Sequence, residues 1–457
     1  MDWIPTISEG HGPLYLRIVE AIATDVAIGR LVRGQQLPTH RALAKALGVD
    51  LTTVTRAYGE ARKRGLIDAQ VGRGSFVSET TARATEGPPR ITIDLSMNIP
   101  PQPVEANLDL RIAQGLAAVR GDAGFSAFLS YARPGGSDEE RQAGAAWLSQ
   151  RIPAARTDRL IVYPGAQAIL FNILLTRTSP GDVVLTEAVT YPGLKAAAAR
   201  LGVRLVGVAM DEEGVRPDAL ARACAAHRPK AVYLVPTQHN PTTATLSAER
   251  RHAVAEIVDR ADTVLIEDDA YGALEPQVAP IASLIPERTY YAASLSKVIA
   301  PALRVAYLLA PHDAAEQAMR GALQATVQMS ASLMVALVTQ WMTSGVAEQI
   351  IRAIRHEAAG RQQLAARYLA GLRVAARPHG HHLWVPVPAQ WKREDLIVHL
   401  LRHGLAVVGG DAFAVSEDAP NGIRVSLGAA RNRADLAQAL QVLASALKAP
   451  GSGGQIV

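Results

Sequence analysis

The sequence predicts an α/β protein that folds in two parts. Three observations support this fold class: residues 1–78 have the pattern of short helices followed by a hairpin, residues 79–92 are small, polar and proline-bearing, and strand-like and helical stretches alternate over residues 93–448. Alternation at roughly 20–30 residues per unit is typical of a mostly parallel sheet wrapped by helices. We therefore expect a small N-terminal domain, a linker, a larger domain and a disordered tail over residues 449–457.

Composition and length exclude several classes of protein. The 457 residues are 49% hydrophobic and 19% charged, which is ordinary for a globular protein with large cores. No stretch reaches the ~18–20 uninterrupted apolar residues of a membrane span, and the first residues lack the pattern of a signal peptide. The single cysteine, Cys224, has no partner for an internal disulfide. We therefore expect a cytoplasmic protein that does not bind membranes.

The N-terminal domain begins with three predicted helices. Apolar residues at four-residue spacing predict an amphipathic helix over 13–30. Thr39 is a favourable N-cap for a second helix, which is expected to end at Gly48. A third helix is expected over 51–64, with its apolar side chains facing the core. The tight turn between the last two helices is typical of a helix-turn-helix, which places its second helix in the major groove of DNA.

Outward-facing polar residues of this region are candidates for DNA contact. Hydroxyl and guanidinium groups near the start of the third helix are able to reach base edges or phosphates. Two short strands, Leu66-Ile67 and Phe76-Val77, flank a glycine-rich turn that lets the backbone approach a phosphate. The alternative is a helix-turn-helix that contacts another protein. The candidates are Thr52, Thr53, Arg56, Gly72, Arg73 and Gly74.

The stretch LPTHRALAKALGVDLTTVTRAYGEARKRGLIDAQVGRGSFV resembles the winged helix of GntR-family regulators throughout. The resemblance implies that Arg41 also contacts double-stranded DNA, together with the threonines and the glycine-rich wing named above. The sequence departs from the family at Asp50-Leu51, where a small polar residue is usually followed by arginine. We therefore expect base recognition at this position to differ from that of the family.

The larger domain is predicted to contain a buried sheet and a small C-terminal subdomain. After about residue 320 the chain becomes rich in helical patterns, and two later strand-like runs indicate a small α+β subdomain. The predicted strands of the large sheet are Leu160–Tyr163, Val183–Thr186, Ala231–Val235, Thr263–Glu267 and Thr289–Ala293, and those of the subdomain are Leu383–Val387 and Ile423–Ser426.

Several residues that follow these strands suit an anion such as phosphate. A glycine at a strand-to-helix turn exposes backbone N–H groups and the positive end of the helix dipole to an anion. Nearby hydroxyls and a guanidinium add further donors. The candidates are Gly165, Ala166, Gln167, Ser294, Ser296 and Arg304.

A second group of residues suits an aromatic aldehyde cofactor. Lys297 follows an apolar strand, so we expect it to be partly buried, which lowers the pKa of a lysine and frees its amine for Schiff-base formation. Asp268 ends another buried strand, where its carboxylate could keep a ring nitrogen protonated. Tyr191 could stack on the ring. Asn240 and Tyr271 could donate to a ring hydroxyl.

Arg424 lies in a run that otherwise suits a buried strand. A buried arginine needs an anion, and two partners are open: the carboxylate of a bound amino acid, or a structural Asp or Glu. Taken together, the lysine, the acid, the hydroxyl donors and the anion-binding residues meet the needs of pyridoxal 5'-phosphate, PLP.

The order and spacing of this set resemble the fold-type I, class I/II PLP-dependent aminotransferases over residues 93–448. The resemblance implies a homodimer in which Tyr131, in the run YARPGG, reaches the phosphate in the neighbouring subunit. Thr243 replaces the glycine that usually follows Asn-Pro-Thr, which is a mild departure in the loop. A GntR-type winged helix fused to such a domain is similar to the MocR subfamily of bacterial regulators.

The histidines at positions 379, 381 and 382 do not predict a metal site. Adjacent residues on a strand point to opposite faces, so His381 and His382 are poorly placed to share one ion. We expect no metal in this protein.

The function predicted from the sequence is that of a PLP-dependent transcription regulator. It would bind a double-stranded DNA operator and sense an amino acid, another amine or PLP itself. One alternative is a working aminotransferase, fast or slow, that converts an amino acid to a 2-oxo acid and carries an appended DNA-binding module. Another is a DNA-binding protein whose larger domain serves only as a dimerisation scaffold.

Overall fold

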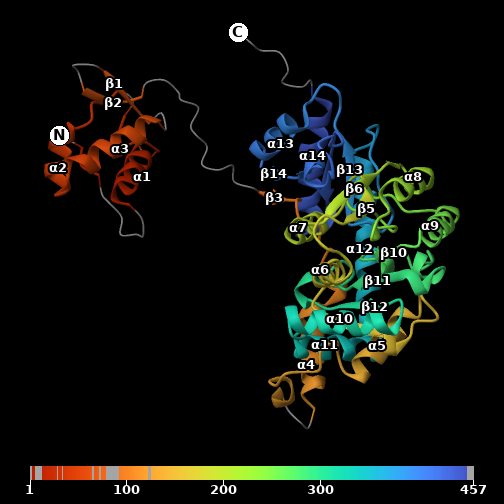
Figure 1. The fold of residues 1–457 in the computed structure, drawn as a ribbon. Helices are drawn as coiled ribbons and strands as arrows, with labels where there is room; N and C mark the ends of the chain where they lie inside the picture. The colour runs from red at the N-terminus through yellow and green to blue at the C-terminus, as the bar shows by residue number, and fades with distance from the viewer. Residues whose placement is uncertain are drawn as a thin grey trace. The chain divides into compact units, whose positions relative to one another are not determined.

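The structure, a computed structural model, describes residues 3–5, 13–27, 29–32, 34–63, 66–70, 74–78, 92–121 and 125–449 (Figure 1). The chain forms two compact units, Met1–Arg90 and Ile91–Val457. Gly72 and Arg73 of the predicted wing, residues 79–91 of the predicted linker and residues 450–457 of the tail lie outside the described ranges. Within those ranges, no helix is both long enough and apolar enough to cross a membrane.

The N-terminal unit has the predicted three helices and hairpin. Thr39 caps the second helix by accepting a hydrogen bond from the Ala42 backbone at 3.2 Å, and Gly48 ends it in the left-handed conformation. The apolar faces of the helices share one core that includes Ile18 and Val54. The elements are α1 (Leu14–Ala27), α2 (His40–Leu47), α3 (Leu51–Lys63), β1 (Ile67–Gln70) and β2 (Gly74–Val77), with β1 and β2 antiparallel.

The larger unit is organised around a seven-stranded, mostly parallel sheet, as predicted. Only β12 runs antiparallel to its two neighbours. The other neighbouring pairs are parallel. The strand order is β4 (Leu160–Tyr163), β12 (Ala306–Leu309), β11 (Thr289–Ser294), β10 (Val264–Asp268), β9 (Ala231–Leu234), β5 (Val183–Glu187) and β6 (Arg204–Val208).

Helices cover both faces of this sheet, because parallel neighbours need crossover connections. Alternate residues of a strand face opposite sides: Val184 and Ile266 belong to the core that includes α6 and α7, whereas Leu185 and Leu265 belong to the core that includes α8 and α9. These helices are α6 (Ala166–Arg177), α7 (Pro192–Leu201), α8 (Pro217–His227) and α9 (Ala248–Arg260).

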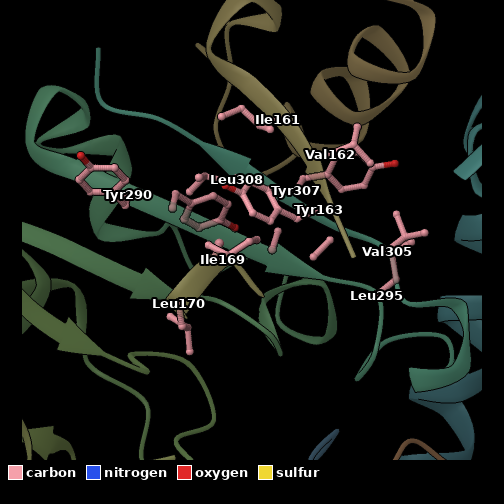
Figure 2. Close-up of a cluster of buried hydrophobic side chains, with 14 of the residues drawn as sticks. Ile161, Val162, Tyr163, Ile169, Leu170, Tyr290, Leu295, Val305, Tyr307 and Leu308 are labelled. Atoms are coloured by element: carbon pink, nitrogen blue, oxygen red, sulfur yellow. The ribbon is translucent and has the colours of Figure 1, made fainter. Parts of the chain in front are cut away.

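The first of these cores is continuous from the sheet to the helices that follow it. Figure 2 shows its centre, where Tyr163 and Tyr307 of the sheet lie near Ile169 and Leu170 of α6. The Tyr163 hydroxyl donates to the backbone carbonyl of Met319 at 2.7 Å, so its polar atom is satisfied inside the core. The other helices around this core are α4 (Leu108–Arg120), α5 (Asp138–Leu148), α10 (Asp313–Thr326) and α11 (Ser332–Thr343).

A smaller α+β subdomain follows, as the sequence predicts. The long helix α12 (Val346–Tyr368) contributes Ile350 and Ile354 to the large core and Ala365 to the core of the subdomain. The subdomain sheet has the order β13 (His382–Pro386), β16 (Gly422–Ser426) and β15 (Val408–Gly409), packed with α13 (Arg393–Arg402) and α14 (Arg433–Lys448). Two further strand pairs are β3 (Ile93–Asp94) with β14 (Leu405–Ala406) and β7 (Met210–Asp211) with β8 (Gly214–Val215).

A buried ion pair anchors the chain just after β10. Arg151 Nη2 lies 2.7 Å from Asp269 Oδ2, which also accepts a hydrogen bond from the Tyr291 hydroxyl at 2.6 Å. Both charged side chains are almost fully buried. Because Asp269 directly follows the last residue of β10, this pair fixes the chain at the edge of the sheet where Asp268 lies.

We expect Asp269→Ala to lower the free energy of unfolding by about 3–5 kcal/mol, because Arg151 would lose its only carboxylate partner among the described residues while staying buried. The matched control is Asp211→Ala, which removes the more exposed pair with Arg250 and should cost about 1 kcal/mol or less. Chemical denaturation of the full-length variants measures both. Equal losses for the two variants would contradict this account of the buried pair.

Candidate cofactor and DNA-binding sites

Most of the predicted cofactor residues come together in one pocket of the larger unit. The pocket lies at the carboxyl ends of the parallel strands, which is where open α/β sheets bind ligands. Asp268 ends β10, and Lys297 follows β11 by three residues. The predicted residues that line the pocket are Ala166, Gln167, Tyr191, Asn240, Asp268, Tyr271, Ser294, Ser296, Lys297 and Arg304.

Lys297 has the properties of an attachment lysine. Its side chain is largely buried, and Nζ donates a hydrogen bond to the backbone carbonyl of Asn98 at 2.6 Å. Burial lowers the pKa of Lys297 to about 8, and the nearby positive charge of Arg424 acts in the same direction. A substantial fraction of the amine is therefore neutral near physiological pH, as nucleophilic attack requires.

Asp268 is a buried acid with one unused oxygen. Its Oδ2 accepts a hydrogen bond from the Tyr233 hydroxyl at 2.7 Å, whereas Oδ1 is buried and has no hydrogen-bond partner among the described residues. Burial raises the pKa of Asp268 to about 6. A protonated ring nitrogen beside Oδ1 would satisfy that oxygen and stabilise the ionised carboxylate.

The anion-binding candidates gather where α6 begins. Gly165 has φ +100°, and a Cβ atom there would lie 2.7 Å from Arg304 Nη2, so only glycine lets the guanidinium come this close. Arg304 itself donates to the backbone carbonyl of Pro164 at 2.8 Å. The first N–H groups of α6 have no partner within the helix. Backbone donors, a guanidinium and the two serine hydroxyls therefore suit a phosphate at this end of the pocket.

Arg424 lies on β16 of the subdomain and is hydrogen-bonded, but not to a carboxylate. Its Nη1 donates to Asn240 Oδ1 at 2.8 Å, its Nη2 donates to the Ser96 carbonyl, and its guanidinium carbon lies 4.9 Å from the centre of the Phe413 ring. No Asp or Glu of the described residues pairs with this buried cation. The Asn240 amide nitrogen stays available as a donor. A bound carboxylate would supply the charge that the protein does not.

Three residues at this site were not found from the sequence. Tyr233 holds Asp268, Asn98 contacts both Lys297 and Tyr271, and His382 contacts Asn98. Tyr233 belongs to an apolar strand pattern, so nothing distinguished it from a core residue. Asn98 is 173 residues away from Tyr271 in the chain, and no motif spans that separation.

Tyr131 and the histidines at positions 381 and 382 are not among the residues that line the pocket. Tyr131 is 85% exposed. His381 Nε2 lies 2.7 Å from the Lys297 carbonyl oxygen, and His382 Nε2 lies 3.2 Å from the His239 carbonyl oxygen. Burial lowers the pKa of His381 to about 4, so it is neutral. The described part of the chain has no group of His, Cys, Asp or Glu arranged to hold a metal.

The candidate DNA-binding face lies on the N-terminal unit. Arg41, Thr52 and Arg56 are exposed, as is Gly74 at the start of β2, and Thr53 is half-buried. On the inner side, Leu43 of α2 and Val54 of α3 belong to one core, and the Tyr58 hydroxyl of α3 donates to the carbonyl of Pro38, just before α2, at 2.9 Å. The exposed side of α3 carries Thr52 and Arg56.

The departure at Asp50 has a structural role. Asp50 Oδ1 accepts hydrogen bonds from the backbone N–H and the hydroxyl of Thr52, so the aspartate caps the start of α3. The Thr52 hydroxyl is thus already engaged within the protein. Arg56 stacks on the ring of Tyr15, with its guanidinium carbon 4.2 Å from the ring centre, which limits the directions that its donors can take.

Comparisons with known proteins agree with both halves of this description. Residues 90–443 match the family described as aminotransferase class I and II, and residues 14–77 match the bacterial regulatory proteins of the gntR family. An uncharacterised HTH-type transcriptional regulator of Bacillus subtilis, YdeF, is 29% identical over 97% of this chain and 96% of its own length.

Two further relatives bear on the chemistry. The vitamin B6 salvage pathway transcriptional repressor PtsJ of Salmonella typhimurium is 28% identical over 90% of this chain and 93% of its own length. The crystal structure of LysN, an α-aminoadipate aminotransferase from Thermus thermophilus complexed with N-(5'-phosphopyridoxyl)-L-leucine, has a TM-score of 0.71 at 27% identity. It covers 79% of this chain and 95% of its own.

The chain therefore belongs to the class I and II aminotransferase family, and its gntR-type helix-turn-helix makes it a transcriptional regulator of the MocR type.

Proposed function

We propose that this regulator binds PLP in the pocket of the larger unit and senses an amino acid, another amine or PLP itself. The observation that carries the proposal is the combination of Lys297, the unpartnered oxygen of Asp268 and the carboxylate-free Arg424 at one site. A relative named as a vitamin B6 salvage repressor and a structural neighbour complexed with a phosphopyridoxyl amino acid support it. As a DNA-binding regulator, the protein would act in the cytoplasm.

The residues of the pocket fit PLP group by group. When bound, PLP supplies an aldehyde that combines with amines and a ring that withdraws electrons. Lys297 would hold the aldehyde carbon, and Asp268 would keep the ring nitrogen protonated through Oδ1. Tyr191 would stack on the ring, while Asn240 and Tyr271 would donate to its 3-oxygen. The phosphate would bind Gly165, Ala166, Gln167, Ser294, Ser296 and Arg304.

Arg424 would select the effector. Its charge is buried without a carboxylate, so an amino acid would place its carboxylate there and its amine near Lys297. An amine without a carboxylate would leave this charge unpaired, and PLP alone would act simply by filling the pocket. The size of the change in DNA binding that each compound causes would distinguish these three kinds of effector.

Control of DNA binding needs two arrangements of the protein. An effector regulates only if it and the operator prefer different arrangements. A homodimer would provide two winged helices, and Tyr131, which is exposed in one chain, would reach the phosphate in the partner subunit. Exposed apolar residues nearby, Leu129 among them, support burial of this surface between subunits.

An active aminotransferase is the second candidate. The near-neutral pKa of Lys297 and the buried acid at Asp268 favour it, because transamination needs a lysine that moves protons and an acid that maintains the electron-withdrawing ring. Release of a 2-oxo acid from an amino acid, with the cofactor converted to its pyridoxamine form, distinguishes this function from sensing.

The decisive experiment is a footprint of the PLP-loaded protein on the DNA upstream of its own gene and the neighbouring genes, with and without amino acids and amines. A discrete protected site that an amino compound alters supports the proposal. A site that differs only between PLP-free and PLP-loaded protein identifies PLP as the effector. PLP binding without protection of any site favours the enzyme, and failure to bind PLP favours the dimerisation scaffold.

We expect Lys297→Ala to abolish the visible absorbance of lysine-bound PLP while helical content and effector-free DNA protection persist, because the helix-turn-helix belongs to the other unit. The control is Lys230→Ala, an exposed lysine outside the pocket, which should keep the band. A band that survives in Lys297→Ala, or a loss of helical signal, would count against this assignment.

The lowered pKa of Lys297 makes a second prediction. Its amine is protonated below pH 8 and neutral above, so acetylation of the PLP-free protein by acetic anhydride should rise with a midpoint near pH 8. An unperturbed lysine standard should rise near pH 10.4. Mass spectrometry measures acetylation of the Lys297 peptide and of Nα-acetyl-lysine, whose ε-amine is free, across the same pH range. Coincident midpoints would contradict the effect of burial.

For DNA binding, Arg56→Ala should weaken affinity for any duplex and reduce the slope of log affinity against log salt by about 1, as loss of one phosphate contact predicts. Arg260→Ala, which removes an exposed arginine of the larger unit, should leave the slope unchanged. Binding isotherms between 50 and 200 mM salt, about the range over which phosphate contacts dominate, measure both. An unchanged slope in Arg56→Ala would rule out a phosphate contact by this residue.

A further inference from the structure

Asn98 lies where three segments of the larger unit meet beside the cofactor pocket. Its side-chain amide nitrogen is 2.8 Å from the Tyr271 hydroxyl and 3.1 Å from His382 Nδ1. Its backbone carbonyl accepts the hydrogen bond from Lys297 Nζ at 2.6 Å. Asn98 therefore contacts the attachment lysine, a pocket tyrosine and a strand of the subdomain at the same time.

The hydrogens of this group can be assigned from its acceptors. His382 Nε2 lies 3.2 Å from the His239 carbonyl oxygen, which only accepts, so Nε2 carries a hydrogen. Burial lowers the pKa of His382 well below its usual range, so the ring is neutral and has a single hydrogen. Its Nδ1 is consequently bare and must accept from Asn98. The flipped amide would place its oxygen against this lone pair, so the orientation of Asn98 is determined.

This assignment determines what the Tyr271 hydroxyl does. One amide hydrogen of Asn98 goes to His382, and the other goes to the Tyr271 oxygen. Because the Tyr271 oxygen accepts from Asn98, its own hydrogen must go to another acceptor. Tyr271 lines the pocket that also contains Asp268 and Lys297.

We propose that Asn98 is a positioning residue that turns the Tyr271 hydroxyl into a donor toward the 3-oxygen of PLP. The inference rests on the proposed binding of PLP and adds a residue that acts through Tyr271. The relay runs from the His239 carbonyl through His382 and Asn98 to Tyr271, so the direction of one pocket hydrogen is set by a strand of the subdomain.

The charged and titratable groups around Tyr271 are Asp268, Tyr191, Arg424, His381, His382 and Lys297. Burial lowers the pKa of His381 to about 4 and that of His382 well below its usual range, so both rings stay neutral during a titration near neutral pH. Asn98 does not titrate. A change at Asn98 therefore alters hydrogen bonding without altering the charge of the pocket.

The test is a pH titration of the visible band of the PLP-loaded full-length protein. This band changes when the proton between the ring oxygen and the lysine nitrogen is lost. A donor to the ring oxygen stabilises its ionised form and lowers the pH of that change. We expect Asn98→Ala to raise the midpoint by about 0.5–1 pH unit, because Tyr271 is no longer held as a donor. The backbone contact with Lys297 is retained.

Two comparisons separate positioning from a structural effect. Tyr271→Phe removes the donor itself and should raise the midpoint at least as far. Asn98→Ala added to Tyr271→Phe should then shift it no further, within about 0.2 pH unit, because interacting residues are not additive. Gln102→Ala removes a hydrogen bond to the Ile299 carbonyl from the same segment without touching Tyr271, and it should leave the midpoint unchanged.

Should Asn98→Ala not fold, the isosteric Asn98→Asp replaces it, since a carboxylate has no hydrogen to donate. The added negative charge also shifts the midpoint in Asn98→Asp. If Asn98 acts through Tyr271, the midpoint shift caused by Asn98→Asp should be smaller when Tyr271 is replaced by Phe. An unchanged midpoint in Asn98→Ala, or an equal shift with and without Tyr271, would overturn the inference while leaving PLP binding intact. Absence of a visible band in the unmodified protein would overturn the proposed function, and the inference with it.

Discussion

The parallel pairing of β9, β10 and β11 is the constraint on which the pocket depends. Parallel strands end at the same edge of a sheet, and Asp268 is in register with Ala292, two residues before Ser294. The register of the backbone hydrogen bonds therefore brings Asp268 close to the segment 294–297 that carries Lys297. This proximity does not depend on a hydrogen bond between the two side chains. The buried pair between Arg151 and Asp269 fixes the chain immediately after this register.

Desolvation gives this edge its chemistry. Burial raises the pKa of Glu187 to about 8 and that of Asp268 to about 6, while it lowers the pKa of Lys297 to about 8. All three shifts favour the neutral form, although near pH 7 Asp268 remains mostly ionised and Lys297 mostly protonated. A ligand with a cationic ring nitrogen and an anionic phosphate would place a positive charge beside Asp268 and a negative charge beside Arg304. Binding of such a ligand is therefore linked to ionisation of the pocket residues.

Sequence patterns predicted five of the seven strands of the large sheet to within about one residue at each end, because buried parallel strands are continuous apolar runs with polar residues at their ends. The same logic places Asp268 and Lys297 near the ends of such runs: Asp268 is the last residue of β10, and Lys297 lies three residues after β11. It missed β6, whose residues are partly exposed, and β12, which is separated from Lys297 by only a short 3-10 helix, Pro301–Leu303. The sequence patterns also missed the contact between Asn98 and His382. These residues are 284 positions apart in the chain, and they meet because of how the subdomain packs, which no local spacing predicts.

The subdomain contributes two residues that lie beside the pocket, Arg424 and His382. Arg424 lies on β16, which pairs with β13, and β13 begins at His382. A carboxylate drawn to Arg424 would pull directly on this sheet, and the same sheet holds Asn98 through His382. The helix α12 contributes side chains to the large core at one end and to the subdomain core at the other, so the subdomain moves only if α12 bends or moves with it. Because packed cores resist small continuous deformation, a change of ligand is expected to move the subdomain between discrete positions.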